Sequence, residues 1–347
     1  MRNNIQEDDV LITVLMTVYC GKEYLSEAIE SILNQTLKDF EFLIINEYGS
    51  DEDTTAILQN YASQDSRIKL IQNDTRLGFS ASLNKGLKLA RGKYIARMDP
   101  DDISVPKRLE LQYRFMERHP EYILCGGNIR YINDNVLSHH VQRYLTKSSQ
   151  IKTSLLFICE FSHPTIMFRR SDMEQNGYLY DENIKTEDYE LWSRIVYKHK
   201  TANLGKILLH YRIHGNNSVN IYKDKVAEST TEVQKRIFHN HHIDSNLKNQ
   251  VLEGAYSLEQ LEELETDLLR LMINNRENFP NKFVFRNRMD VVYRNTEINI
   301  GIEINKHKRY WNKFNAIYGK NFRSIQIMDY FIFGLKDFLW NLLYHGY

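Results

Sequence analysis

Arg97-Met98-Asp99-Pro100-Asp101-Asp102 is the stretch of sequence on which the fold prediction rests. It follows the apolar run Tyr94-Ile95-Ala96, which is typical of a buried strand, and it precedes Pro106, which suits the first turn of a helix. Three carboxylates therefore lie where a strand ends, which is where ligands bind in open α/β sheets. Closely spaced carboxylates repel one another unless a cation or solvent relieves them. Asp99 and Asp101 indicate a site for Mg²⁺ or Mn²⁺, and the alternative interpretation is a solvated acidic turn.

Apolar strands and amphipathic helices alternate on the N-terminal side of this stretch. The run from Val10 to Val18 is continuously apolar and rich in β-branched residues, which favours a parallel strand buried on both faces. The pattern predicts further strands at 40–45 and 68–71, and helices at 24–33, 54–61 and 77–90. Short links between these segments indicate an α/β fold with a doubly wound, Rossmann-like, mostly parallel sheet. Polar clusters follow several of the strands, so we expect them to surround one site.

The chain beyond Pro106 is predicted to continue this domain and then to change in character. The pattern indicates strands at 122–132, 165–170 (after Pro164) and 207–211, a helix at 150–158, and a helix that begins at Thr186. Glycine becomes scarce after residue 222, and the pattern there is helical. We therefore divide the chain into an α/β domain at 1–221 and a helical C-terminal region at 222–347. A leucine stripe in the second region favours an intramolecular core over a dimer seam; its members are Leu261, Leu264, Leu268 and Leu271.

Composition excludes several classes of protein. The 347 residues carry 45 basic and 45 acidic side chains, so net charge gives no reason to expect nucleic acid as a partner. The three cysteines are far apart, without the spacing of a metal cluster or a disulfide framework, which fits a reducing compartment. We find no secretory signal in residues 1–9 and no uncharged apolar run long enough to span a membrane. The expected location is the cytoplasm, and the oligomeric state is left open.

The end of the sequence has a different composition. Lys306 to Arg323 interleaves basic residues with Tyr310, Trp311, Phe314 and Tyr318, and Ile325 to Leu343 is almost wholly apolar and aromatic. Such a segment fits a helix lying in the headgroup region of an anionic membrane, on the inner face of the cytoplasmic membrane. The alternative is a final helix packed on its own domain, and the sequence favours neither.

Six motifs occur in an order that resembles family 2 glycosyltransferases of the GT-A fold, most closely the bacterial enzymes that extend surface polysaccharides. The motifs are Thr17-Val18-Tyr19 followed by Ser31-Ile32-Leu33-Asn34-Gln35-Thr36; Leu77-Gly78-Phe79-Ser80-Ala81-Ser82-Leu83-Asn84-Lys85-Gly86; Ala96 to Asp102; His163-Pro164; Glu187 to Trp192; and Tyr211-Arg212-Ile213-His214. Residues 10 to about 220 carry the resemblance. It implies an inverting, metal-dependent transfer of a sugar from a nucleotide sugar, with UDP expected, to a hydroxyl of a glycan or lipid-linked oligosaccharide.

The resemblance also implies roles for the acids. Asp188 is expected to be the general base that takes the acceptor proton, with Glu187 beside it raising its proton affinity or orienting the loop. Two acids that stabilise a helix N-terminus are the alternative, and both can hold at once. Asp101, Asp99 and His214 are expected to hold the metal, with Asp99 also able to touch the ribose. We expect the acids near residue 100 and the acid at 188 to face each other across one site.

The remaining expected roles concern the nucleoside and the sugars. Thr17, Tyr19, Glu47 and Arg76 are expected to frame the nucleoside. Glu47 stands where the family usually has the second residue of Asp-Asp-Gly-Ser, and Pro100 stands where a small residue is usual. On the acceptor and sugar side we expect three residues: Trp192, which could equally be a core tryptophan, His163, and Arg212 as a phosphate-facing cation.

Two other functions compete with the transferase. A nucleotidyltransferase would need a glycine-rich phosphate loop after the first strand, and Cys20-Gly21-Lys22 is too short for one. A non-catalytic nucleotide-sugar-binding module of a polysaccharide assembly complex is the second alternative. Such a module would need neither the pair Asp99 and Asp101 nor Asp188, and the chain has all three, so the sequence favours the enzyme.

Overall fold

A computed structural model describes residues 10–133, 136–215, 222–241, 254–274 and 282–304 of the chain. The chain forms two compact units, residues 1–240 and 241–347, and each is described by itself. Helix α9 (Lys223–Asn240) belongs to the first unit, where Gln234 Nε2 donates to the carbonyl of Phe157 at 2.9 Å. The functional division expected at residue 221 stays a prediction.

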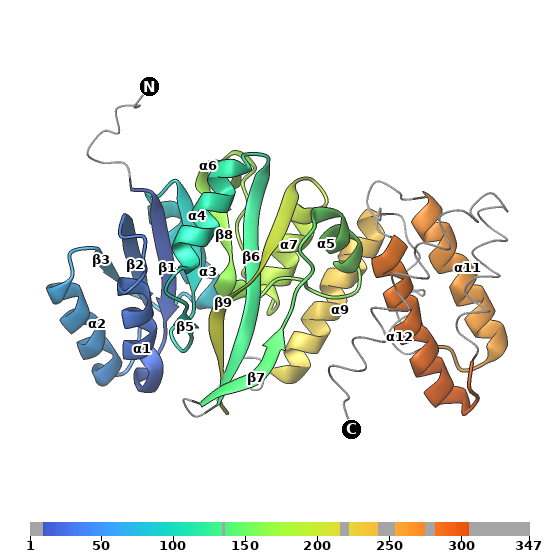
Figure 1. The fold of residues 1–347 in the computed structure, drawn as a ribbon. Coiled ribbons are helices and arrows are strands. Elements are labelled where there is room, and N and C mark those ends of the chain that lie inside the picture. The colour runs from blue at the N-terminus through green and yellow to red at the C-terminus, as the bar shows by residue number, and fades with distance from the viewer. Residues whose placement is uncertain (1–9, 134–135, 216–221, 242–253, 275–281, 305–347) are drawn as a thin grey trace. The chain divides into compact units, whose positions relative to one another are not determined.

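A mixed sheet forms the centre of the first unit (Figure 1). Within the described residues it has nine strands in the order β3-β2-β1-β4-β8-β6-β9-β5, with β7 paired to β6. The strands are β1 (Ile12–Val18), β2 (Phe40–Asn46), β3 (Ile68–Gln72), β4 (Tyr94–Met98), β5 (Ile103–Ser104), β6 (Tyr122–Asn133), β7 (Val136–Gln142), β8 (Met167–Arg169) and β9 (Lys200–Ile213). Strands β1 to β4 are parallel, β8 runs antiparallel to β4 and β6, and β6 is parallel to β9. The carboxyl ends of β1, β2 and β4 therefore lie at one edge of the sheet.

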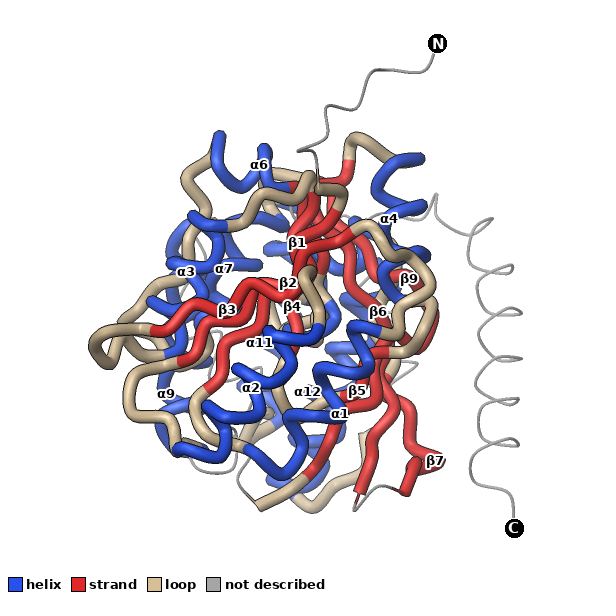
Figure 2. Tube along the Cα trace, turned by 90° about the vertical axis from the view of Figure 1, so that its left-hand side faces the viewer, coloured by secondary structure: helices blue, strands red, loops and turns tan. Residues whose placement is uncertain are grey.

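Helices lie on both sides of these strands (Figure 2). Among the described residues before α9, the first unit has the helices α1 (Lys22–Leu33), α2 (Glu52–Gln64), α3 (Phe79–Leu89), α4 (Arg108–Arg118), α5 (Ser148–Ser154), the 3₁₀ turn η1 (His163–Thr165), α6 (Arg170–Gln175) and α7 (Glu187–Val196). This arrangement confirms the α/β fold and the alternation of strands and helices predicted from the sequence.

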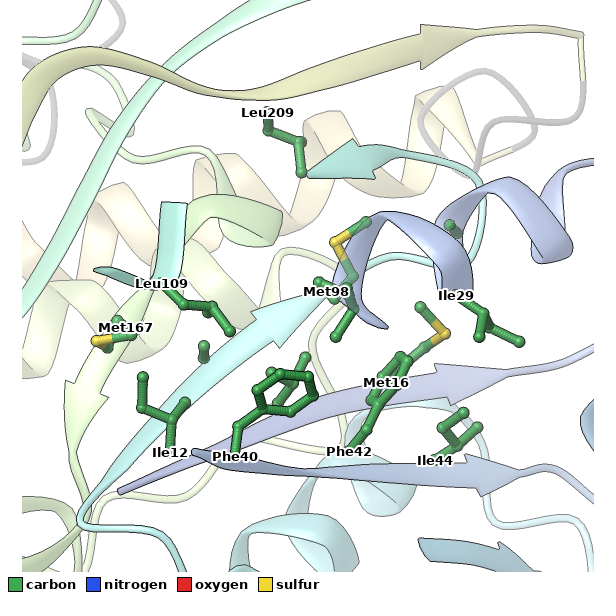
Figure 3. Close-up of a cluster of buried hydrophobic side chains, with 14 of the residues drawn as sticks. Ile12, Met16, Ile29, Phe40, Phe42, Ile44, Met98, Leu109, Met167 and Leu209 are labelled. Carbon is green, nitrogen blue, oxygen red and sulfur yellow. The ribbon is translucent and has the colours of Figure 1, made fainter. Parts of the chain in front are cut away.

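The apolar character of β1 explains why it lies at the centre of the sheet. All seven of its residues are buried. On one face Ile12 and Met16 join a cluster with Phe42 and with Ile29 of α1 (Figure 3). On the other face Leu15 meets Gly86 of α3 so closely that a Cβ on Gly86 would lie 2.2 Å from Leu15 Cδ1. A glycine is required there because the helix approaches the strand without room for a side chain.

Three predicted elements differ from what the structure contains. The strand expected at 207–211 extends over Lys200–Ile213 as β9. The strand expected after Pro164, at 165–170, is present as the shorter strand β8, which follows the 3₁₀ turn η1. Thr186 occupies the N-cap position of α7, but its side chain makes no capping hydrogen bond. Tertiary pairing decides the first two cases, because β9 and β8 are held by neighbouring strands rather than by an alternating sequence pattern.

The described part of the second unit contains the helices α11 (Leu258–Asn274) and α12 (Lys282–Ile300). The leucine stripe of α11 is buried, and Tyr293 Oη donates to Glu265 Oε1 at 2.9 Å. Burial of the stripe agrees with the predicted intramolecular core. Among the described residues we find no helix with the length and apolarity needed to cross a bilayer. The segments Lys306 to Arg323 and Ile325 to Leu343 lie outside the described residues.

Candidate active site

The three acids after β4 form the first part of the site. Oxygen atoms of Asp99, Asp101 and Asp102 lie within 4.8 Å of one another. Asp99 forms an ion pair with Arg97, and Asp101 Oδ2 lies 3.0 Å from His214 Nε2. The predicted grouping of Asp99, Asp101 and His214 is therefore present at one place, although no contact with a metal is described.

Asp102 belongs to this group as well, and the sequence analysis did not assign it a role. Its Oδ1 accepts a hydrogen bond from the backbone N–H of Arg212 at 2.9 Å, while its Oδ2 is buried without a hydrogen-bond partner. Burial raises the pKa of Asp102 well above its usual value, and the charges of Asp101 and Asp99 raise it further. Burial also raises the pKa of Asp99, against the opposing charge of Arg97.

The chemistry of these groups fits a hard divalent cation. An orphaned, buried carboxylate oxygen beside two further carboxylates costs free energy that a cation would recover. Mg²⁺ and Mn²⁺ both prefer oxygen ligands. Asp99, Asp101 and Asp102, with His214 beside them, are the side chains that would hold it.

Arg212 supports the turn that carries these acids. Its guanidinium donates to the carbonyl of Asp101 at 2.9 Å and to Glu27 Oε2 at 2.8 Å, and it stacks on the Tyr24 ring at 4.3 Å. The side chain is almost completely buried. The described contacts of Arg212 are thus with the protein, and its expected contact with phosphate stays a prediction.

Gln35 explains why the motif at the end of α1 accompanies the acid motif in the sequence. Its buried amide donates to the carbonyl of Val105 at 2.8 Å and to Ser104 Oγ at 3.2 Å. Its carbonyl oxygen accepts from the N–H of Leu109 at 3.0 Å. Arg108 adds a hydrogen bond from Nη2 to the carbonyl of Arg97 at 2.6 Å. Both ends of the acid turn are therefore held by buried side chains.

Glu47 organises the loop on the nucleoside side of the site. Its two oxygens accept five hydrogen bonds, from the N–H groups of Tyr48, Leu77 and Gly78 and from the side chains of Asn73 and Ser82. These bonds lower the pKa of Glu47, although burial alone would raise it. Gly78 has a positive φ of 90°, which a residue with a side chain rarely adopts. The predicted contact of Glu47 with a nucleobase stays a prediction, and its described partners belong to the chain.

The other residues expected at the nucleoside lie near one another. Arg76 is exposed, and its guanidinium lies over the Tyr19 ring at 4.4 Å, so these two side chains stack on each other. Tyr19 is 47% exposed, just beyond the end of β1, and Thr17 lies at that end. Their placement agrees with a nucleoside site without testing it.

Glu187 and Asp188 lie in the first turn of α7. Burial raises the pKa of Glu187 to about 8, helped by the neighbouring charge of Asp188. Burial also raises the pKa of Asp188, whose Oδ1 accepts a hydrogen bond from the N–H of Tyr189 at 2.7 Å. The charge of Asp188 in turn raises the pKa of Asp99. Acids that are 89 positions apart in the sequence therefore lie close enough in space to affect each other's ionisation.

The structure decides whether Trp192 is a sugar-contacting or a core tryptophan. The side chain is 0% exposed and its Nε1 has no hydrogen-bond partner, so it has no surface on which a sugar could stack. It is a core tryptophan. His163 packs edge-on against it, with ring centroids 6.0 Å apart, and lies 3.7 Å from Glu187 Oε1 through Nδ1. His163 therefore lies beside the acids of α7, as its expected place on the acceptor side requires.

Arg97 is the residue whose importance the sequence analysis missed. Its side chain is 3% exposed, and its charge acts on both groups of acids, since it lowers the pKa values of Asp99, Glu187 and Asp188. A charged residue within the apolar strand Tyr94–Met98 is the signal that could have identified it, because an arginine is rarely buried without acidic partners.

Comparison with known protein families gives one match. The model of the glycosyl transferase family 2 domain matches residues 13–177. An uncharacterized glycosyltransferase of Methanocaldococcus jannaschii is 38% identical over 59% of this chain and 72% of its own length. The O-antigen biosynthesis glycosyltransferase WbnJ of Escherichia coli is 37% identical over 59% of this chain and 80% of its own length.

Solved structures resemble this chain in fold. TarS 1-349 of S. aureus, in complex with UDP-GlcNAc, superposes with a TM-score of 0.53 at 16% identity, covering 84% of each chain. The mannosyltransferase PcManGT from Pyrobaculum calidifontis, in complex with GDP-Man and Mn²⁺, has a TM-score of 0.50 at 10% identity, covering 97% of this chain and 88% of the other. At such low identity the likeness concerns the arrangement of helices and strands.

Proposed function

This chain belongs to glycosyltransferase family 2 and has the GT-A fold, and from that premise we propose that it is an inverting, metal-dependent transferase. It moves a sugar from a UDP-sugar to a hydroxyl of a glycan or lipid-linked oligosaccharide during surface polysaccharide synthesis. The names of relatives such as the O-antigen glycosyltransferase WbnJ and the amylovoran glycosyltransferase AmsE of Erwinia amylovora support this kind of product.

One observation carries the proposal. Two groups of acids from separate segments, Asp99 to Asp102 after β4 and Glu187 with Asp188 on α7, lie close enough for their charges to interact. The group after β4 can bind a cation that neutralises a diphosphate, and the group on α7 can accept a proton. A transferase needs both groups on either side of one sugar.

The donor half of the reaction uses the first group. Asp99, Asp101 and Asp102, with His214, would hold a divalent cation, which stabilises the negative charge that develops on the diphosphate as it leaves. The exposed pair of Tyr19 and Arg76 offers a ring face and a cation to the nucleoside. UDP is the proposed carrier, and TarS crystallised with UDP-GlcNAc supports that choice.

The acceptor half uses the second group. The acceptor oxygen attacks the anomeric carbon while the bond from that carbon to the diphosphate breaks, and Asp188 takes the proton of the attacking hydroxyl. Burial raises the pKa of Asp188, which makes the carboxylate a stronger base than an exposed aspartate. Because one displacement occurs and no covalent sugar intermediate is formed, the configuration at the anomeric carbon inverts.

The test is a panel of UDP-sugars and GDP-sugars with Mn²⁺ or Mg²⁺, in which released nucleotide is measured with and without oligosaccharide acceptors. We expect release of UDP with at least one donor, dependence on the cation, and a product whose new linkage is inverted by NMR. Retention of configuration would contradict the assignment of Asp188. Release of nucleotide from GDP-sugars alone would contradict the choice of UDP.

We further propose that residues 306–347 bring the enzyme to the inner face of an anionic cytoplasmic membrane. The support is the sequence alone, because basic and aromatic residues alternate in Lys306 to Arg323 and an apolar segment follows. A lipid-linked acceptor would be concentrated at that surface.

A further inference from the structure

The imidazole of His163 contacts four side chains, and its expected role on the acceptor side does not account for these contacts. Its Nε2 lies 2.9 Å from Tyr180 Oη, and its Nδ1 lies 3.7 Å from Glu187 Oε1. The ring meets Phe79 at a centroid distance of 6.3 Å and Trp192 at 6.0 Å, both edge-on. Two aromatic neighbours thus fix the plane of the imidazole, and each nitrogen has a defined direction.

Hydrogen bonds from Asn84 of helix α3 hold the backbone of Tyr180 in place. Asn84 of α3 accepts a hydrogen bond from the N–H of Tyr180 at 2.9 Å and donates to its carbonyl at 3.0 Å. Asn84 also donates to Glu182 Oε1 at 3.0 Å. The backbone on both sides of Tyr180 therefore cannot shift without breaking buried hydrogen bonds, and its hydroxyl has a fixed position.

We propose that Tyr180 and His163 are positioning residues for Glu187: the Tyr180 hydroxyl donates to Nε2 of His163, so that Nδ1 carries the ring proton and directs it at the Glu187 carboxylate. A neutral imidazole has one donor and one acceptor nitrogen, and the partner of one nitrogen decides the state of the other. This inference rests on the proposed function, in which Glu187 stands beside the general base Asp188.

The opposite tautomer fits the surroundings less well. Above about pH 8, where Glu187 is ionised, a proton on Nε2 would leave the lone pair of Nδ1 facing carboxylate oxygens that offer no proton to it. A doubly protonated ring is also disfavoured, because burial and the charge of Arg97 lower the pKa of His163 well below its usual value. With the proton on Nδ1, Nε2 accepts from the Tyr180 hydroxyl, and a polar N–H faces the ionised Glu187 carboxylate at 3.7 Å, an electrostatic contact longer than a hydrogen bond.

The consequence for the reaction follows from the helix that Glu187 begins. Glu187 and Asp188 are the first two residues of α7. An N–H group that faces Glu187 stabilises its ionised form and thereby the negative charge beside Asp188. Partners of this indirect kind typically change the efficiency of a site by about 10-fold to 100-fold when they are removed.

Tyr180→Phe tests the proposal because it removes one oxygen and leaves the ring and the Asn84 contacts in place. We expect kcat to fall about 10-fold while the KM for the donor changes by less than about two-fold. In a Glu187→Gln background the same substitution should have little further effect on kcat, because Tyr180 acts through Glu187. If Tyr180→Phe lowered kcat by the same factor in the wild type and in the Glu187→Gln background, the proposal would be overturned.

Tyr178→Phe is a matched control. Tyr178 is a buried tyrosine of the same unit, and its hydroxyl lies 3.0 Å from His199 Nε2, so the substitution removes the same kind of hydrogen bond away from the acids. We expect the two variants to lose similar thermal stability and only Tyr180→Phe to lose kcat. An equal loss of kcat in both would mean that stability alone is responsible, which would also overturn the proposal.

A second measurement does not depend on activity. In protein labelled with ¹⁵N at its 12 histidines, the signals of His163 are assigned by their loss in His163→Gln, and they report which ring nitrogen carries the proton. At about pH 9, where Glu187 is ionised, we expect Nδ1 to be protonated in the wild type and the two tautomers to be mixed in Tyr180→Phe. A proton on Nε2 in the wild type would overturn the proposal. Should no donor be consumed in the panel described above, the proposed function fails while this measurement still decides the tautomer.

Discussion

Arg97 connects the acids of the site at the scale of single residues. Burial raises the pKa values of four carboxylates, and the charge of Arg97 lowers each of them; the four are Asp99, Asp102, Glu187 and Asp188. Charges in a buried site act over longer distances than charges in water. The ionisation of the base and of the cation site is therefore linked through one guanidinium.

Asp188→Asn tests the general base. The amide has the same shape as the carboxylate but cannot take a proton, so kcat should fall by about 100-fold to 10,000-fold while binding of the donor is retained. Steady-state release of UDP and calorimetric titration with UDP measure the two quantities. Asp65→Asn is the control, since Asp65 is bound to Arg67 at 2.7 Å before β3 and has no part in the site. A fully active Asp188→Asn enzyme would refute the assignment.

Glu187→Gln should change how stability depends on pH. The pKa of Glu187 is raised from its usual 4.5 to about 8, so between these values the folded chain keeps a proton that the unfolded chain has released. The free energy of unfolding contributed by this group is therefore unaffected below about pH 4.5, falls as pH rises towards 8, and is constant above it. Glutamine removes this loss, because it never ionises.

The measurement is thermal or urea unfolding of both proteins at pH 5 and pH 8.5 without added metal. We expect Glu187→Gln to be more stable than the wild type at pH 8.5, by on the order of 1–3 kcal/mol, and to differ much less at pH 5. A difference between the two proteins that is the same at pH 5 and pH 8.5 would show that Glu187 is already ionised at pH 5 in the folded chain, against the raised pKa.

The loop before α3 depends on one carboxylate, which makes it testable at the scale of elements. Glu47→Gln replaces an oxygen acceptor with an N–H₂ group facing the N–H donors of Leu77 and Gly78. The loop should lose its conformation locally, and affinity for UDP should fall about 10-fold. Titration calorimetry measures the change.

Glu41→Gln is the matched control for this variant. Glu41 is also buried, and it accepts hydrogen bonds from Thr13 Oγ1 at 2.7 Å and from the N–H of Arg91 at 2.9 Å. It lies at the amino end of β2, whereas Glu47 follows the carboxyl end. Both variants should lose stability, but only Glu47→Gln should lose affinity for UDP. Equal loss of affinity in both would refute a special role for the loop.

Gln35 connects α1 to the turn that carries the acids. Its substitution should therefore change the cation site, although Gln35 is not one of the side chains that would hold the cation. Gln35→Ala leaves the carbonyl of Val105 and the N–H of Leu109 without their partner, which should cost about 2–4 kcal/mol of unfolding free energy. The concentration of Mn²⁺ needed for half-maximal activity should rise. Gln64→Ala, which loses an exposed bond to Asn60 on α2, should leave both quantities unchanged.

Sequence patterns predicted the elements that are decided by local burial and missed those decided by tertiary contacts. The apolar run of β1 identifies a central strand because all its residues are buried. The polar strand β9 carries no such pattern, and its pairing with β6 is interrupted by register shifts. Thr186 has the residue type of an N-cap, but its hydroxyl is buried without a partner. Residue type alone could not reveal that outcome.

The same limit applies to the candidate site. The order of motifs in the sequence predicted that Asp99 and Asp188 belong together, and the structure brings them within reach of each other's charge. The role of Asn84 in fixing Tyr180 could not be predicted, because the two residues are far apart in sequence and neither is a typical catalytic residue. The core position of Trp192 depended on packing that a single sequence does not specify.

At the scale of the whole molecule, the residues proposed for chemistry and those proposed for the membrane lie in different units. Every side chain assigned to the site belongs to residues 1–240, while the basic and aromatic segment begins at Lys306. Deletion of residues 306–347 should therefore leave donor consumption in solution within about two-fold of the full chain and abolish binding to vesicles that contain anionic lipid.

Co-sedimentation with vesicles of defined composition distinguishes the contributions to that binding. Replacement of the basic residues of Lys306 to Arg323 by glutamine should weaken binding to anionic vesicles by about 1 kcal/mol per charge and remove its dependence on salt. Binding that survives this replacement at high salt would have to come from the apolar segment Ile325 to Leu343. Unchanged sedimentation of the deleted chain would show that the segment does not bind membrane, and the interpretation as a helix packed on its own domain would then hold.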